Sequence, residues 1–417
     1  MDRQAPLKIA LLGYRSNPYS GGQGIYLHYL SKALLAAGHE VDVISGPPYP
    51  ELVDGVRLIE LPSLDLFAAP NHVTALRWRH LRSLTDTFEY FSMLTGGFPE
   101  PYTFGRRLES WFRREKPRYD IVHDNQSLCY GTLALQNRGI PVVTTIHHPI
   151  TSDLALALAG AESLGHRLLI KRWHNFIGMQ KKVASRLHHI VTVSECSRRD
   201  IIEAFGLLPA RVRVVYNGID TETFRPLANV QRKPNQVMAT ASADQPLKGL
   251  AYLLRAMAML RSHHPGLELL VVGKVKEGGE TDRLLDSLGI RDRVRFVSGL
   301  RTEEIVRHYA ESTVVVVPSI YEGFGFPAGE AMSCGVPVVS TDGGALPEVV
   351  GDAGKTVPVR DAGAIADAIG GLMADAGERE RLGAAGRRRI LERFSWQIAA
   401  DQMVETYRSV HHESVET

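Results

Sequence analysis

The sequence predicts an α/β protein built from two doubly wound domains. Short apolar runs alternate along the chain with longer segments whose apolar residues follow helical spacing, which is typical of parallel sheets covered by helices. At 417 residues the chain is too long for one core and suits two domains of about 200 residues each. A polar, proline-containing stretch without periodicity covers residues 227–235. We therefore predict domains at 1–227 and 236–395, followed by a terminal helix over 396–417.

Composition and charge exclude several classes of protein. With 44% hydrophobic and 23% charged residues the chain is ordinary for a globular protein, and a net charge of +2 gives no reason to expect a nucleic-acid partner. Cys129, Cys196 and Cys334 are odd in number and widely spaced, without a metal-ligand pattern, which favours core thiols in a reducing compartment. No export segment or long apolar run stands out. We expect a cytoplasmic protein that makes at most peripheral contact with the inner face of the membrane.

The first strand and helix enclose a glycine-rich loop. Residues 7–12 form an apolar run that ends at Gly13, residues 25–35 follow helical spacing, and residues 41–44 predict the next strand of a βαβ unit. The loop closes with Gly22 and Gly24, which suggests a dinucleotide-binding fingerprint. Leu27 occupies the place of the third glycine, however, and the pair stands far beyond the strand, so the pattern argues against a dehydrogenase. A flexible surface loop is the other interpretation.

Further strands are predicted at 119–124, 141–146, 190–193 and 212–216, and a helix is predicted over 173–187. The strand 141–146 ends at His147 and His148, at the edge where parallel sheets bind their ligands. A metal site there is a poor interpretation, because consecutive residues of a strand point to opposite faces and no third ligand is evident.

Residues 60–115 have the weakest pattern. Segments 77–82 and 106–116 mix basic residues with apolar residues at helical spacing. Such segments can contact an anionic membrane or an acidic acceptor. In the other interpretation, Leu108, Trp111 and Phe112 face the core and the arginines stay solvated. The loop 95–101 between them is a candidate lid on the acceptor side.

The second half repeats the alternation. Strands are predicted at 237–240, 267–272, 294–297, 314–317 and 336–340, and helices at 250–257, 362–373, 378–394 and 397–411. Lys248 stands just before the first of these helices, where a long cationic side chain can reach a diphosphate beside the helix amino end.

The stretch from Pro318 to Met332 joins the strand 314–317 to a helix through a glycine-containing loop. Backbone N–H groups around Phe324 to Pro327 then point out of the carboxyl edge of the sheet, where an anion is stabilised. Glu322 precedes the turn, and we place Glu330 in the first helical turn, so both carboxylates can face one ligand that carries hydroxyls. The alternative is that Glu330 only complements the helix dipole and Glu322 is solvated.

A wider pattern surrounds these two glutamates. Seven residues separate them, and they are followed by Ala-Met-Ser-Cys-Gly-Val-Pro-Val-Val over 331–339, then Ser-Thr-Asp-Gly-Gly over 340–344 and Pro347-Glu348. This pattern resembles the signature of retaining nucleotide-sugar glycosyltransferases of family four, which have the GT-B fold. The resemblance implies two Rossmann-like domains facing a central cleft, with the acceptor on the first, the donor on the second and a terminal helix that crosses back to the first domain.

The resemblance also implies roles for individual residues. Glu330 would accept hydrogen bonds from the ribose hydroxyls, Glu322 would contact the donor sugar, and His147 would hold that sugar, although the adjacent His148 leaves this assignment open. We expect His147, Lys248 and Glu322 to be catalytic. The full set of predicted donor-binding positions is Gly22, Ser242, Lys248, Val297, Glu322, Phe324, Gly325, Phe326 and Glu330.

Ser242 departs from the family pattern, which usually has an arginine six residues before the lysine at 248. A hydroxyl brings no charge to the leaving diphosphate, so a nucleotide-sugar-binding or scaffold subunit with weakened catalysis is the alternative to an active hexosyltransferase. No Asp-x-Asp pair stands out, and we expect neither an obligatory divalent metal nor a cofactor besides the nucleoside-diphosphate sugar. The acceptor would be a small molecule, a glycan or a lipid.

Overall fold

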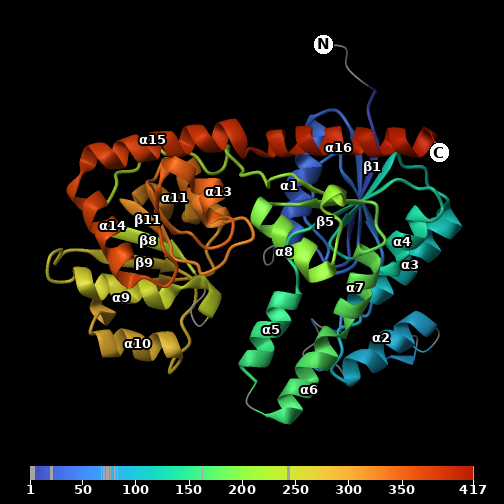
Figure 1. Ribbon diagram of the computed structural model, residues 1–417, viewed down its shortest axis with the longest axis horizontal. Coiled ribbons are helices and arrows are strands. Elements are labelled where there is room, and N and C mark those ends of the chain that lie inside the picture. The colour runs from blue at the N-terminus through green and yellow to red at the C-terminus, as the bar shows by residue number, and fades with distance from the viewer. Residues whose placement is uncertain are drawn as a thin grey trace. The chain divides into compact units, whose positions relative to one another are not determined.

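The computed structural model describes residues 5–18, 22–66, 68, 71, 75, 77–78, 81, 83–161, 163–241 and 245–416 (Figure 1). The chain divides into two compact units. Unit 1 contains residues 1–193, 197–215 and 399–417, and unit 2 contains residues 194–196 and 216–398. The division along the chain thus falls after Val215, and the predicted linker 227–235 lies within unit 2.

The described part of unit 1 contains a seven-stranded parallel sheet in the order β3-β2-β1-β4-β5-β6-β7. Its strands are β1 (Lys8–Gly13), β2 (Glu40–Ser45), β3 (Arg57–Glu60), β4 (Ile121–Asn125), β5 (Val142–Ile146), β6 (His189–Thr192) and β7 (Val212–Val214). Its helices are α1 (Gly22–Ala36), α2 (Leu84–Leu94), α3 (Glu100–Glu115), α4 (Tyr130–Gln136), α5 (Thr151–Ala159), α6 (Leu164–Trp173) and α7 (Ile177–Ala184), together with α8 (Glu195–Phe205) from its third residue and α16 (Trp396–Glu416) from its fourth.

Alternate residues of the unit 1 strands face opposite layers of helices. Ala10 and Leu12 of β1 belong to the core cluster that α3, α4, α7 and α8 complete, whereas Ile9 and Leu11 are equally buried on the other face. A sheet with both faces covered must be apolar throughout, which explains the continuous runs in the sequence.

The described part of unit 2 contains a six-stranded parallel sheet in the order β10-β9-β8-β11-β12-β13. Its strands are β8 (Gln236–Thr240), β9 (Glu268–Val272), β10 (Val294–Val297), β11 (Val314–Val317), β12 (Val338–Thr341) and β13 (Lys355–Val357). Its helices are α9 (Leu250–Leu260), α10 (Glu280–Leu288), α11 (Thr302–Glu311), α12 (Phe326–Ser333), α13 (Leu346–Val350), α14 (Ala362–Ala374) and α15 (Ala376–Arg393).

The last helix, drawn in red in Figure 1, is tied into unit 1 by a buried polar contact. The Tyr407 hydroxyl lies 2.5 Å from Nδ1 of His123 on β4, and Nε2 of His123 lies 2.7 Å from the Thr145 hydroxyl. All three side chains are buried, and burial lowers the pKa of His123 to about 3, so this imidazole is neutral.

Strands were predicted more completely than helices. Eleven of the strands match predicted segments to within a few residues, while β3 and β13 were missed. The single helix predicted over 173–187 is wrong: α6 ends at Trp173, a short 3-10 turn follows, and α7 covers Ile177–Ala184. The three cysteines are buried and unpaired, as predicted. Among the described helices, none is long and apolar enough to cross a membrane.

Replacing Tyr407 with phenylalanine should destabilise unit 1. The change leaves buried Nδ1 of His123 without its partner, which we expect to cost about 1–3 kcal/mol of unfolding free energy. Urea unfolding of full-length protein measures the change. Ser409→Ala, which removes an exposed contact to Glu413 on the same helix, is the control and should stay within about 0.5 kcal/mol. Equal stability of wild type and Tyr407→Phe would contradict the prediction.

Candidate functional site

The candidate site of unit 2 lies where the strand order reverses. From β8 the chain moves outward through β9 and β10, then returns to pair β11 with β8 on the other side. The chain segments that follow β8 and β11 therefore leave adjacent strands at their carboxyl ends, the usual ligand position in open α/β sheets. The loop after β8 carries Lys248, and the loop after β11 carries Glu322.

Close backbone packing holds these two loops together. Ile320 donates its N–H to the Leu247 carbonyl at 2.8 Å. Gly249 has a φ of +64°, and a side chain there would overlap the Pro318 carbonyl. Gly344 has a φ of +66°, and a side chain there would overlap the Glu322 carbonyl. Glycine at these two positions thus lets three chain segments meet at the end of β11.

The result is an ion pair between two of the residues predicted to be catalytic. Nζ of Lys248 donates to Oε1 of Glu322 at 2.8 Å, and the Ser319 hydroxyl donates to the same oxygen at 2.8 Å. The Glu322 side chain is 12% exposed and that of Lys248 is 33% exposed, so the pair is partly accessible. Among the described residues no donor is found for Oε2 of Glu322.

Helix α12 follows the loop directly. Gly325 has a φ of +102°, and the helix begins at Phe326 with Pro327 in its first turn, so first-turn N–H groups lie beside this loop. The expectation that Glu330 occupies the first turn is wrong: it is the fifth residue of α12, because the helix begins earlier than the proline suggested. The Tyr309 hydroxyl donates to Oε2 of Glu330 at 3.0 Å, and burial raises the pKa of Glu330 to about 7.

The other residues of unit 2 that were predicted to bind the donor lie at different places in the structure. Phe324 is buried against Phe326 and Phe394, so its side chain anchors the loop in the core. Val297 ends β10, two strands away from β8, and its carbonyl accepts the Gly273 N–H at 2.8 Å. Ser242 lies outside the described residues.

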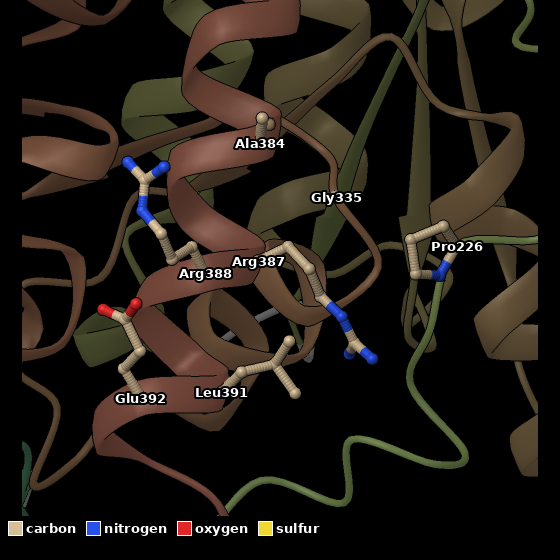
Figure 2. Close-up of a pocket in the computed structure, with 8 residues that line it drawn as sticks. Pro226, Gly335, Ala384, Arg387, Arg388, Leu391 and Glu392 are labelled. Atoms are coloured by element: carbon tan, nitrogen blue, oxygen red, sulfur yellow. The ribbon is translucent and has the colours of Figure 1, made fainter.

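A separate depression of about 660 Å³ lies along α15. Figure 2 shows Arg387 and Leu391 pointing toward Pro226, with Arg388 and Glu392 directed to the other side of the helix. Arg387 is occupied by structural bonds, since it donates to the carbonyls of Phe224, Ser333 and Thr221. None of the predicted donor-binding residues lines this depression.

In unit 1 the order of the strands reverses between β1 and β4, and His147 stands at the end of β5 beside β4. Nε2 of His147 lies 2.7 Å from Oδ1 of Asn125, and its backbone N–H donates to Oε1 of Gln126 at 2.7 Å. The Tyr26 ring packs edge-on against the imidazole, with 4.8 Å between the two ring centroids. These contacts hold both the backbone and the ring of His147.

Asn125 determines which nitrogen of His147 carries the proton. Its Nδ2 donates to the Gln23 carbonyl at 3.0 Å, which orients Oδ1 toward the imidazole. Since Oδ1 can only accept, Nε2 of His147 must be protonated. Burial lowers the pKa of His147 to about 3, so the ring is neutral and Nδ1 is left as an acceptor suited to a hydroxyl group. His148 is instead partly exposed, and its Nε2 lies 3.2 Å from Oδ2 of Asp153.

Two glycines at the start of α1 differ in what the fold requires. A Cβ atom on Gly24 would overlap the Asn17 carbonyl, so this glycine allows the loop after β1 to pack on the helix. A Cβ atom on Gly22 meets no described atom within 4 Å. The fold therefore accounts for Gly24 and leaves Gly22 available for contact with a ligand.

Comparison with known proteins shows the family of this chain. Residues 20–223 match the model of Glycosyltransferase Family 4, and residues 222–389 match the model of Glycosyl transferases group 1. A protein named MMP alpha-(1->4)-mannosyltransferase from Mycolicibacterium hassiacum is 42% identical over 405 residues, which cover 96% of this chain and 98% of that protein. The chain belongs to glycosyltransferase family 4.

More distant relatives extend the comparison. A D-inositol 3-phosphate glycosyltransferase from Acidothermus cellulolyticus is 28% identical, with 97% of this chain and 90% of that protein covered. The solved structure of sucrose-phosphate synthase from Thermosynechococcus elongatus matches 97% of this chain and 99% of its own, with a TM-score of 0.72 and 25% identity. The two parallel-sheet units have the GT-B fold, and the protein is a glycosyltransferase.

Sequence reasoning missed four polar residues of this glycosyltransferase that hold the predicted ones. Ser319 and Asn125 each stand at the end of a predicted strand, and this position was a usable signal. Gln126 follows Asn125 directly. Tyr309 gave no signal, because a tyrosine inside an amphipathic helix is typical of a core residue.

Asn125→Asp should raise the pKa of His147. A carboxylate near Nε2 favours the charged imidazolium, so we expect the pKa to rise by at least about one unit from its value near 3. An NMR titration of the imidazole signals, assigned with His147→Gln, measures it. Asp153→Asn, which removes the carboxylate beside His148, is the control and should leave the titration of His147 unchanged. A His147 signal that titrates alike in wild type and Asn125→Asp would refute the argument.

Proposed function

We propose that this glycosyltransferase moves a mannosyl residue from a nucleoside-diphosphate mannose to a glycan acceptor, with retention of anomeric configuration and without an obligatory divalent metal. The observation that carries the proposal is the partly exposed Lys248–Glu322 pair beside the first turn of α12. A cation, a carboxylate and helix N–H groups at one point match the charges of a diphosphate-linked sugar.

The pair can serve a donor without being dismantled. An ammonium group has three N–H donors, and Lys248 uses one of them on Glu322, so others can reach diphosphate oxygens. Glu322 receives its two bonds on Oε1, which leaves Oε2 for a sugar hydroxyl. As the glycosidic bond breaks, negative charge grows on the leaving diphosphate and positive charge grows on the sugar ring. Lys248 and Glu322 are placed to stabilise these opposite charges.

The choice of mannose rests on the relative from Mycolicibacterium hassiacum, whose name describes an α-(1→4)-mannosyltransferase. Identity of 42% along nearly the whole of both chains supports the same sugar and a related acceptor. Retention is supported by the resemblance of residues 322–348 to retaining enzymes of the family. Metal independence is supported by Lys248 and the dipole of α12, which supply positive charge at the diphosphate.

Lys248→Ala and Glu322→Ala should each lower kcat by at least about a hundredfold, because each removes a charge that opposes one developing in the transition state. Transfer of radiolabelled mannose to a mannoside acceptor measures the rate. Lys276→Ala, which removes an exposed lysine elsewhere in unit 2, is the matched control and should keep normal turnover. Near-normal rates in both site variants would refute the assignment.

Donor identity is tested by thermal unfolding in the presence of mannose and glucose linked to guanosine, uridine or adenosine diphosphate. A mannose donor at a hundred times its Kd should stabilise the protein by about 2.7 kcal/mol. Proton NMR of the product then reads the anomeric configuration, and a chelator tests metal dependence. An inverted anomer, a preference for glucose or loss of transfer with the chelator would each overturn the corresponding part of the proposal.

Nucleotide binding should weaken as the pH falls through about 7. Ribose hydroxyls donate to the Glu330 carboxylate, and burial brings the pKa of this group to about 7, so acidification converts an acceptor into a neutral acid. If only the ionised form binds, Kd rises about tenfold between pH 8 and pH 6. Calorimetric titration with the nucleoside diphosphate measures it. In Glu330→Gln, any remaining pH dependence of Kd comes from titration of the diphosphate itself. If Kd depended on pH in this variant as it does in the wild type, Glu330 would have no role in binding the ribose.

A further inference from the structure

One face of helix α2 is apolar and uncovered by the described residues. Leu84, Phe88, Phe91 and Leu94 follow helical spacing and are 80%, 45%, 53% and 46% exposed. The opposite face is also apolar, since Tyr90 and Met93 are buried in a small cluster with Leu66. A helix that is apolar on both faces normally has both of them covered.

Helix α6 continues this exposed surface. It has no buried residue, and Leu164, Leu168 and Leu169 are 81%, 67% and 58% exposed. The carboxyl ends of the two helices are joined, because Arg172 donates to the hydroxyls of Ser92 and Thr95 at 3.2 and 2.9 Å. Figure 1 shows α2 and α6 in the same part of unit 1. The α2–α6 surface is defined as Leu84, Phe88, Phe91, Leu94, Leu164, Leu168 and Leu169.

The charged side chains of α6 and α7 have one sign. Residues 163–194 include no aspartate or glutamate, whereas Arg167 and Lys171 on α6 and Lys181 and Lys182 on α7 are exposed. On α2, Asp86 and Glu89 both pair with Arg107, which leaves one of these two negative charges uncompensated, and the Glu89 carboxylate is 1% exposed. The exposed apolar residues therefore lie beside cations without competing carboxylates on α6 and α7.

We propose that the α2–α6 surface docks on an anionic lipid bilayer. Its leucine and phenylalanine side chains enter the boundary between head groups and acyl chains, while Arg167 and Lys171 meet the lipid phosphates. Exposed apolar residues beside cations are the combination that interfacial helices use, and neither alone gives stable attachment. Trp78, 87% exposed in the segment that precedes α2, has a side chain suited to the same boundary.

The same charges argue against a second copy as the occupant. A two-fold dimer through this surface would bring Arg167 and Lys171 of one copy toward the same cations of the other. Like charges opposed across an interface are unfavourable, whereas phosphates of an anionic membrane match them. An exposed apolar patch of this kind marks an interaction site. The positive charge beside the patch favours a negatively charged membrane as the partner.

The sequence placed a possible membrane contact at 77–82 and 106–116. The second segment lies on α3, where Leu108 and Phe112 are buried in the core and Trp111 packs against it partly buried, so it offers arginines with little accessible apolar surface. The α2–α6 surface offers both. The proposal is independent of the donor site in unit 2, and either can fail alone.

Flotation of the full chain with vesicles tests the proposal. We expect binding to vesicles of equimolar phosphatidylcholine and phosphatidylglycerol, and at least about tenfold weaker binding to phosphatidylcholine alone. Leu168→Glu, which removes an inserting side chain and adds a repelled charge, should weaken binding at least about tenfold, as should the double change Arg167→Glu with Lys171→Glu. Leu208→Glu is the matched control, because Leu208 is 61% exposed elsewhere in unit 1. It should bind like wild type.

Unchanged thermal unfolding and nucleotide binding in Leu168→Glu confirm that the variant is folded. Absence of wild-type binding, equal binding to both vesicle types, or equal weakening by Leu208→Glu would overturn the proposal. A concentration-dependent dimer in sedimentation that Leu168→Glu abolishes, without vesicle binding, would show that the occupant is a second copy and would overturn it as well.

Discussion

The candidate sites depend on a constraint of parallel sheets: two adjacent strands lead into helices on opposite faces of the sheet only where the strand order reverses. In unit 2 this happens between β8 and β11, and in unit 1 between β1 and β4. At such a point polar groups reach an opening without breaking the hydrogen bonds of the sheet. Lys248 and Glu322 lie at the first of these positions, and Gly22 and Asn125 lie at the second. The fold thus determines where polar side chains gather, and the loops determine which chemistry they carry.

The Lys248–Glu322 pair illustrates how such a site is kept ready. A carboxylate that is only 12% exposed has lost most of its contact with water, and here a cation and a hydroxyl donate to the same oxygen. The pair is weak evidence for stability, because ion pairs at partly accessible positions contribute little after desolvation. Its value is geometric: the side chains hold each other in place before a ligand arrives, which lowers the ordering cost of binding.

The sequence predicted strands well because buried parallel strands leave an unambiguous signal. The run 314–317 is four valines, and β11 covers the same residues. Residues 57–60 and 355–357 were missed because edge strands are short and only half-buried, so their pattern resembles a loop. Glu330 was placed one turn too early because Pro327 marks the first turn without showing which residue begins it. The contact between Tyr309 and Glu330 joins separate helices, which one sequence does not reveal.

The glycines of the two sites separate into those that the fold explains and one that it does not. Gly249 and Gly344 have positive φ angles and contact carbonyl groups, so a side chain at either position would force the loops apart. Gly24 has no positive φ but lies against the Asn17 carbonyl with the same consequence. Gly22 has neither a positive φ nor a described neighbour. Among the described residues, packing and conformation would both permit alanine at 22. The fold therefore accounts for the glycines at 24, 249 and 344 and not for the glycine at 22, which a sequence pattern alone does not distinguish from the others.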